Sequence, residues 1–104
     1  MAKRKLANRS HIVYELVVGD HSYIGVTVVE NRSPKKSLAR RWRKHVQRAY
    51  AENRGWKLCE AIRSHGPDAF EMTILAVHKN KASAHDMERD MIRAYCPDLN
   101  TDVR

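Results

Sequence analysis

Alternation of apolar and polar positions predicts three β-strands. Residues 11–18 and 22–29 are rich in β-branched and aromatic side chains. Gly19 and Asp20, between these segments, are typical of a tight hairpin turn, so the first two strands should pair antiparallel. Residues 69–77 alternate in the same way and predict a third strand.

Three segments with helical spacing complete the pattern. Ser33 followed by Pro34 is typical of a helix start, and the apolar spacing predicts a long helix that reaches residue 52. A second helix over about residues 56–64 should end before a Gly-Pro pair. A last helix, capped by Asn80 or Ser83, should run to about residue 95 and end before a proline.

The apolar face of the long helix carries two polar residues. At about 100° per residue, this face consists of Leu38, Trp42, Val46 and Ala49. Arg41 and His45 fall on the face or at its edge. Arg41 alone would often be an edge residue that extends its charged end into solvent.

The last helix has a carboxylate in the middle of its apolar face. This face is predicted to consist of Ala84, Met87, Met91, Ile92 and Tyr95. Glu88 stands among them, and a carboxylate directed into a core costs several kcal/mol unless it meets a cation, a donor or a metal ion. Glu88 should therefore form a buried salt bridge, with Arg41 as one candidate partner, or bind a metal ion.

The predicted hairpin contains two tyrosines and an unusual glycine. Tyr14 and Tyr23 lie nine positions apart across the tight turn, so they should be close together. The ordinary alternative is that both are core residues with satisfied hydroxyls. Gly25 weakens a β-branched strand unless backbone or ligand approaches closely there.

Positive charge is concentrated in the first part of the chain. The protein has 104 residues and a formal net charge of +8. The densest segment, residues 35–48, contains no acid and seven basic residues, Lys35, Lys36, Arg40, Arg41, Arg43, Lys44 and Arg48. Such a stripe attracts a polyanion, and nucleic acid is the natural partner. A merely solvated helix face stays as the alternative.

Length and composition restrict the classes of protein to which the chain can belong. A chain of this length allows one domain, and its 42% hydrophobic fraction is typical of a globular protein. No apolar run approaches the ~20 residues that span a bilayer, so we expect a soluble protein. Cys59 and Cys96 are too few for a disulfide framework and lack zinc-site spacing, which favours reduced cysteines in the cytoplasm.

Five elements, in this order and spacing, resemble the GIY-YIG nucleases. They are Tyr14 in IVY, the tripeptide Tyr23-Ile24-Gly25, Arg41 with His45 in RRWRKH, Glu88 in ERDMIRAY, and Asn100 in PDLNT. The likeness runs from about residue 11 to residue 100. The first tripeptide departs from the family pattern, because its leading glycine is replaced by Ile12. That glycine is a backbone feature, so the departure concerns the strand's geometry more than the chemistry.

The resemblance implies an α+β fold, with a small three-stranded antiparallel sheet flanked by about three helices. This nuclease domain would occupy residues 10–104, after a basic arm formed by residues 1–9. It would be a stand-alone endonuclease of homing or phage type, in the cytoplasm of a prokaryotic or phage-infected cell. The implied reaction is hydrolysis of DNA phosphodiester bonds, double-stranded DNA being the expected substrate.

The resemblance also gives the unusual residues roles. Glu88 would be the only protein ligand of one Mg²⁺ or Mn²⁺ ion, since such ions keep most of their waters. Arg41 would contact the scissile phosphate. Tyr14 would be the general base, with its pKa lowered by the metal and the guanidinium, and His45 is the competing base or a phosphate donor. Tyr23 would orient the water or another residue of the site.

Two residues would be structural, and the basic stripe would hold DNA. Gly25 would allow close approach in the strand, and Asn100 would tether the C-terminal segment. DNA-binding residues would be Lys35, Lys36, Arg40, Arg43, Lys44 and Arg48.

Other readings stay open. The chain has no HExxH motif, and neither the strand-end histidines His11 and His21 nor the pair Asp68 and Glu71, which lacks a following lysine, fits another metal site. The main alternative is a non-catalytic nucleic-acid-binding module. A homodimer, or a nuclease subunit that needs a partner for targeting, also stays open.

Overall fold

The computed structural model describes residues 9–52 and 56–100. The strands are β1 (His11–Val18), β2 (His21–Val28) and β3 (Glu71–His78). The helices are α1 (Pro34–Gln47), α2 (Lys57–His65) and α3 (Lys81–Tyr95). A π-helical turn, η2 (Arg48–Glu52), continues α1, and a short 3-10 turn, η3 (Pro67–Ala69), precedes β3. The expected basic arm, residues 1–9, lies outside the described residues except for Arg9.

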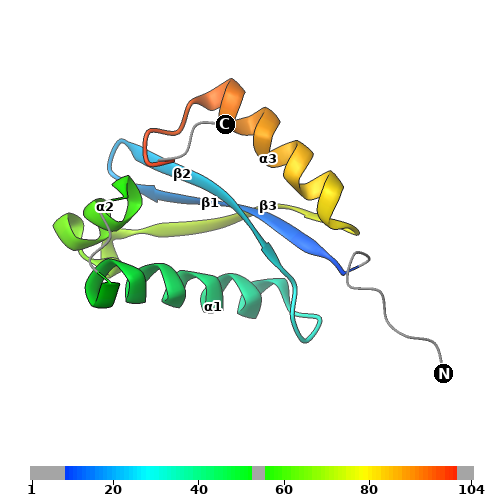
Figure 1. The fold of residues 1–104 in the computed structure, drawn as a ribbon, viewed down its shortest axis with the longest axis horizontal. Coiled ribbons are helices and arrows are strands. Elements are labelled where there is room, and N and C mark those ends of the chain that lie inside the picture. Colours follow the sequence, from blue (N-terminus) through cyan, green and yellow to red (C-terminus); the bar gives the residue numbers. More distant parts are fainter. Residues whose placement is uncertain (1–8, 53–55, 101–104) are drawn as a thin grey trace.

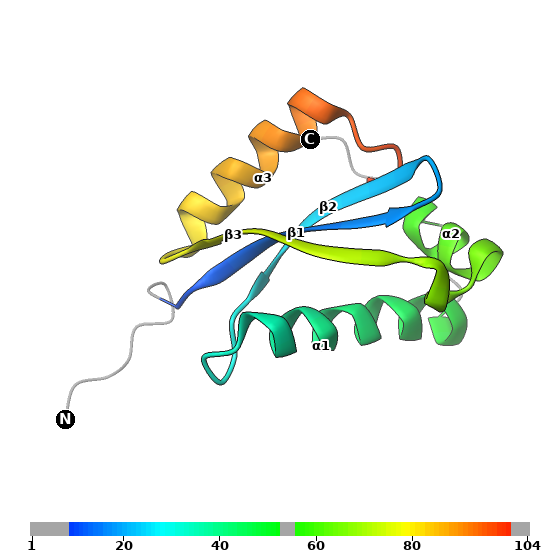
Figure 2. The ribbon, with the colours of Figure 1, turned by 180° about the vertical axis from the view of Figure 1, so that it is seen from behind.

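The strands form one antiparallel sheet in the order β2-β1-β3. The predicted α+β fold, with a three-stranded antiparallel sheet and three helices, is confirmed. Figures 1 and 2 show α1 and α2 on one side of the sheet and α3 on the other. No helix in the described part of the chain is long and apolar enough to cross a membrane.

Local sequence signals place the helix ends. The Ser33 side chain accepts a hydrogen bond from Lys36 N, which caps α1, and Asn80 caps α3 by accepting from Ser83 N. Gly66, with a φ of 87°, ends α2 one residue later than predicted. The predicted third strand starts two residues too early, because residues 67–69 form a helical turn first.

Each side of the sheet has its own core. On the α1 and α2 side, alternate residues of β1 (Ile12, Tyr14, Leu16 and Val18) pack against Leu38 and Ala49 and against apolar residues of α2. On the α3 side, Val13 and Ile24 pack against Ala84 and the half-buried Met87, Met91 and Ile92. The prediction for Tyr95 is wrong, because its side chain is 69% exposed. The apolar face ends one turn earlier, at Met91 and Ile92, and the helix itself ends at Cys96, which has a left-handed conformation.

The C-terminal segment covers the outer edge of β2. Asn100 Oδ1 accepts a hydrogen bond from Ile24 N at 2.9 Å, and Asn100 Nδ2 donates to Ile24 O at 2.8 Å. Leu99 N donates to Ser22 O at 2.9 Å, and an Asp98 carboxylate oxygen accepts from Ser22 N at 3.0 Å. Asn100 therefore lies where a tether of this segment is expected, and it satisfies backbone groups that an edge strand leaves open.

Candidate active site

Gly25 makes room for two tyrosines on the sheet. Gly25 lies directly opposite Tyr14 in the β1-β2 ladder. A Cβ atom at position 25 would lie 2.7 Å from Tyr14 Oη and 2.8 Å from Tyr23 Cε1. The close approach expected at this glycine is therefore made by the two tyrosine side chains, whose ring centroids lie 6.2 Å apart.

Helix α1 places His45 against both tyrosines. Because His45 follows Leu38 and Trp42 along the buried face of α1, its ring points at the sheet and is 4% exposed. His45 Nε2 lies 2.9 Å from Tyr14 Oη. The His45 ring also packs edge-on against Tyr23, with centroids 5.4 Å apart. Three of the predicted site residues thus form one buried cluster, which we call the Tyr-His cluster (Tyr14, Tyr23 and His45).

Burial fixes the protonation of the Tyr-His cluster. Burial lowers the pKa of His45 to about 3, and the charges of Arg41 and Arg48 act in the same direction. His45 is therefore neutral at physiological pH, and in the tautomer with the proton on Nδ1 its Nε2 accepts a hydrogen bond from the hydroxyl of Tyr14. Burial, followed by the neighbouring Tyr23, raises the pKa of Tyr14, and the opposing effect of Arg41 is smaller. Arg41 acts in the expected direction, but desolvation of the phenolate outweighs it, and the lowering expected from a metal ion stays a prediction.

Arg41 lies beside the Tyr-His cluster with unused hydrogen-bonding capacity. Its positive charge acts on the pKa of Tyr14, of Tyr23 and of His45, so the guanidinium is close to all three side chains. Arg41 Nε is buried and has no hydrogen-bond partner among residues 9–52 and 56–100. A buried donor without a partner is costly, and an anion bound at this position would satisfy it.

Glu88 approaches the cluster from the other side of the sheet. Its side chain is 24% exposed, and Oε1 lies 3.2 Å from Nδ1 of His85, one turn earlier on α3. The carboxylate also contributes to the raised pKa of Tyr23, although burial is the larger cause. Within the described chain no ion pair joins Glu88 to Arg41, so the salt bridge considered from the sequence is absent.

The donor set at Glu88 fits a hydrated divalent cation. The described residues contain no group of three or more His, Cys, Asp or Glu side chains that could hold a metal ion. A site built on Glu88 therefore offers a single, partly exposed carboxylate. That suits Mg²⁺, which retains several waters and completes its coordination with substrate phosphate oxygens. It does not suit Zn²⁺, which needs three or four protein ligands.

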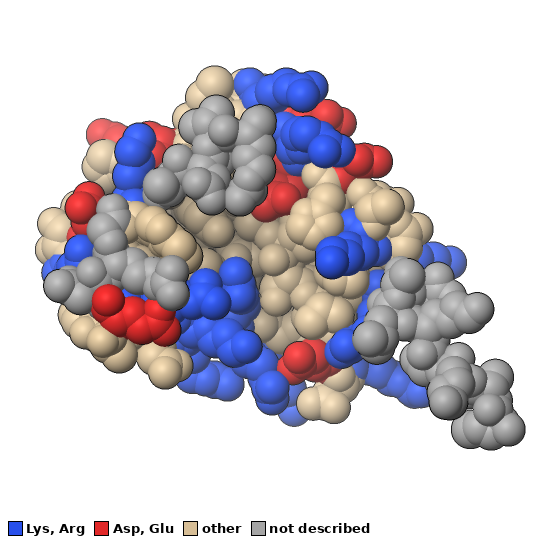
Figure 3. Space-filling model, in the orientation of Figure 1, with Lys and Arg blue, Asp and Glu red and all other residues tan. Residues whose placement is uncertain are grey.

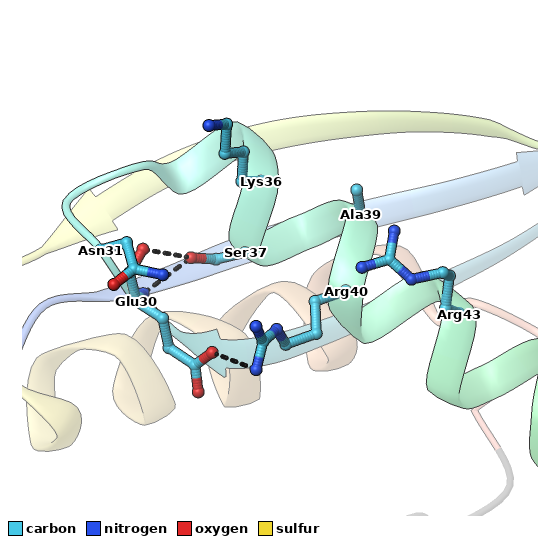
Figure 4. Close-up of a pocket in the computed structure, with 7 residues that line it drawn as sticks. All are labelled: Glu30, Asn31, Lys36, Ser37, Ala39, Arg40 and Arg43. Atoms are coloured by element: carbon cyan, nitrogen blue, oxygen red, sulfur yellow. Dashed lines mark hydrogen bonds and ion pairs between the residues drawn. The ribbon is translucent and has the colours of Figure 1, made fainter.

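Most of the predicted DNA-binding residues lie on the outer face of α1. Five of them are exposed or partly exposed, namely Lys35, Lys36, Arg40, Arg43 and Lys44. Figure 3 shows lysine and arginine side chains gathered over the region of α1, beside a hollow of uncharged residues between α1 and α3. Part of this surface forms a pocket of about 320 Å³, where Arg40 pairs with Glu30 at 2.9 Å. Figure 4 shows the residues that line it, with the ion pair as a dashed line.

Arg48 differs from the other residues of the basic stripe. It is half-buried, and its charge lowers the pKa of both His45 and Tyr23. It is also the first residue of the π-helical turn, which changes the angular spacing after α1. Arg48 lies two turns after Arg41, so the regular helical period already places both on the same side of the helix, beside the cluster. His85 was missed, and its spacing three residues before Glu88 was the available signal.

Comparison with protein-family models, with curated proteins and with solved structures found no match to this chain.

Proposed function

We propose that this protein is a Mg²⁺-dependent endonuclease that hydrolyses phosphodiester bonds of DNA, as its resemblance to the GIY-YIG nucleases implies. The observation that carries the proposal is the meeting of Tyr14, His45 and Arg41, with Arg41 Nε buried and unpartnered among the described residues. These residues come from a strand and a helix that are distant in sequence. Hydrophobic packing alone does not explain why an arginine lies beside these two side chains.

Arg41 is the residue that binds the scissile phosphate. Its guanidinium is permanently charged and presents donors in a rigid fork, which suits the non-bridging oxygens of a phosphodiester. Arg41 Nε is buried, so a bound phosphate would give it the partner that the described chain lacks once a shift of the Arg41 side chain exposes this atom. The same contact stabilises the charge that develops on these oxygens in the transition state.

Tyr14 and His45 act together on the attacking water. The water gives a proton to Tyr14 Oη while Tyr14 passes its own proton to His45 Nε2, along the 2.9 Å hydrogen bond. In the protein alone the low pKa of His45, about 3, opposes this transfer. The negative charge of a bound phosphate offsets Arg41 and Arg48, which raises the pKa of His45 and favours the transfer.

Glu88 is the residue that holds the divalent cation. When bound, Mg²⁺ supplies positive charge at the leaving 3′ oxygen. The partly exposed carboxylate of Glu88 and its contact with His85 keep the ligand oriented without filling its remaining lone pairs. The exposed basic residues of α1 bind the flanking phosphates.

The test is incubation of the purified protein with supercoiled plasmid, with and without millimolar Mg²⁺. We expect nicked or linear product only with the metal. Glu88→Gln keeps a hydrogen-bond acceptor for His85, so its melting temperature should change little, because partly exposed substitutions usually stay within about 0.5 kcal/mol. This variant should bind DNA and cut nothing. Cleavage by Glu88→Gln at the wild-type rate would remove Glu88 from the metal site.

A non-catalytic nucleic-acid-binding module is the second candidate. Tyr14 has no exposed surface and its hydroxyl already has a partner, as in an ordinary core tyrosine. This candidate predicts DNA binding through α1 that is independent of metal, with no cleavage by the wild-type protein. A subunit targeted by another protein predicts cleavage only when that protein is added.

A further inference from the structure

The two edge strands of the sheet, β2 and β3, differ in whether other parts of the chain hydrogen-bond to their outer edges. The edge of β2 is covered by residues 98–100, whose backbone and side chains hydrogen-bond to it. No comparable hydrogen bond from outside the sheet reaches β3 within the described residues. Figure 2 shows β3 in the foreground, with neither α1 nor α3 in front of it. An open edge strand of eight residues is a template for pairing with another strand.

Two of the four exposed residues of β3 are apolar, where a monomer would be expected to place polar ones. Met72 is 42% exposed and Val77 is 52% exposed. No lysine or proline, the usual protection of an open edge, occurs within β3. The strand therefore presents both unpaired backbone groups and exposed apolar surface.

A bulge in β3 brings these two residues to the same face of the sheet. In the ladder with β1, Val13 pairs with Ala76 but Tyr14 pairs with Ile74, so Leu75 is an extra residue. Met72, Ile74 and Val77 therefore pair with Leu16, Tyr14 and Ile12, three residues that share one face of β1. Without the bulge, Met72 and Val77 would point to opposite faces, because side chains alternate along a strand.

This arrangement is self-complementary. An antiparallel pair of identical strands in one sheet is related by a two-fold axis perpendicular to the sheet, so facing residues must lie on the same face. Leu75 is the bulge residue and takes no ladder position, so Met72 and Val77 each lie two ladder positions from Ile74. With the axis at Ile74, Met72 therefore lies opposite Val77 of the second copy on one face. On the other face, Glu71 lies opposite His78 of the second copy, next to its Lys79. The axis thus pairs apolar with apolar residues and an acid with the basic end of the strand.

We propose that β3 pairs with β3 of a second copy of this chain in this register, which forms a six-stranded antiparallel sheet across a two-fold axis. The hollow in Figure 3 lies on the β2 side and stays open. The two β2 strands would be about 24 Å apart, since five strand spacings of about 4.8 Å separate them. One strand pair buries a small area, so we expect a reversible, concentration-dependent dimer.

Sedimentation equilibrium of the full chain, from micromolar to submillimolar concentration, measures this association. The wild-type protein should shift from monomer to dimer. Met72→Lys with Val77→Lys places like charges opposite each other and should give a monomer throughout. Met72→Glu with Val77→Lys replaces the same two residues but places opposite charges together, so it should dimerise. Circular dichroism melting checks that both variants fold.

Cysteine pairing tests the register independently. In a Cys96→Ser background, Met72→Cys with Val77→Cys should form a disulfide-linked dimer on mild oxidation, because facing Cβ atoms lie within about 5.5 Å. Met72→Cys alone should not, because residues 72 of the two copies would be about 14 Å apart, four ladder positions along the strands. A wild-type protein that is monomeric at all concentrations, or a cross-link by Met72→Cys alone, would overturn the proposal. If the wild-type protein is monomeric, the open edge of β3 becomes a candidate for pairing with a strand of another protein.

Discussion

Replacing Tyr14 by phenylalanine separates the structural role of its hydroxyl from the catalytic one. The substitution keeps the ring, which is fully buried, and removes only the atom that bonds to His45 at 2.9 Å. His45 Nε2 would then be a buried acceptor without this partner, which costs about 1 to 3 kcal/mol. For a domain of this size, that corresponds to a fall in melting temperature of roughly 5 to 20 °C.

The effect on cleavage should be larger than the effect on folding. If Tyr14 receives the proton of the attacking water, Tyr14→Phe should lose about 10²- to 10⁴-fold in cleavage rate at saturating DNA, the usual contribution of general acid-base catalysis. DNA affinity should change little, since in the proposed mechanism Tyr14 contacts the attacking water and the DNA phosphates are held by basic side chains. Plasmid cleavage, measured well below the melting temperature of the variant, gives the rate.

Tyr95→Phe is the matched control. It removes a hydroxyl from a tyrosine that is 69% exposed at the end of α3, so it should leave both the melting temperature and the cleavage rate unchanged. Cleavage by Tyr14→Phe within about threefold of wild type would refute a general-base role, because even a modest acid-base contribution is about 10²-fold. If His45→Ala abolishes cleavage in the same series, the role passes to His45.

Three further outcomes are expected. Gly25→Ala should lower the free energy of unfolding in urea by about 1 to 3 kcal/mol, because its Cβ would lie within 2.8 Å of both tyrosines; an unchanged midpoint would contradict this packing. The wild-type free energy of unfolding should fall as pH is lowered from 6.5 toward 3, because in this range the unfolded chain protonates His45 while the folded chain keeps it neutral. His45→Gln should show a weaker dependence on pH, and a pH profile parallel to that of the wild type would refute the role of His45. Neutralising Arg43 and Lys44 should reduce the slope of log affinity for DNA against log salt by about one for each phosphate that the protein no longer neutralises, and equal slopes would remove these residues from the interface.

Short-range signals in the sequence determined the elements. Alternation, the Gly19-Asp20 turn and the caps at Ser33 and Asn80 predicted strands and helices that differ from the observed ones by one or two residues, apart from the π-helical end of the long helix. These signals work because they depend on steric and hydrogen-bonding preferences within a few residues. The nearness of Tyr14 and Tyr23 could be predicted for the same reason, since a tight turn fixes the register of a hairpin.

Tertiary structure alone decided how the candidate site is assembled and charged. Helical spacing left His45 at the edge of a face, and only packing against the sheet buried it beside Tyr14. The same burial raises the pKa of Tyr14 against the opposing effect of Arg41, because desolvation depends on everything that surrounds a group and not on its neighbours in sequence. The π-helical turn after α1 and the bulge at Leu75 that brings Met72 and Val77 to one face each insert a residue into a regular repeat. A periodic reading of the sequence cannot locate such insertions, because they are fixed by contacts between elements that are far apart in the chain.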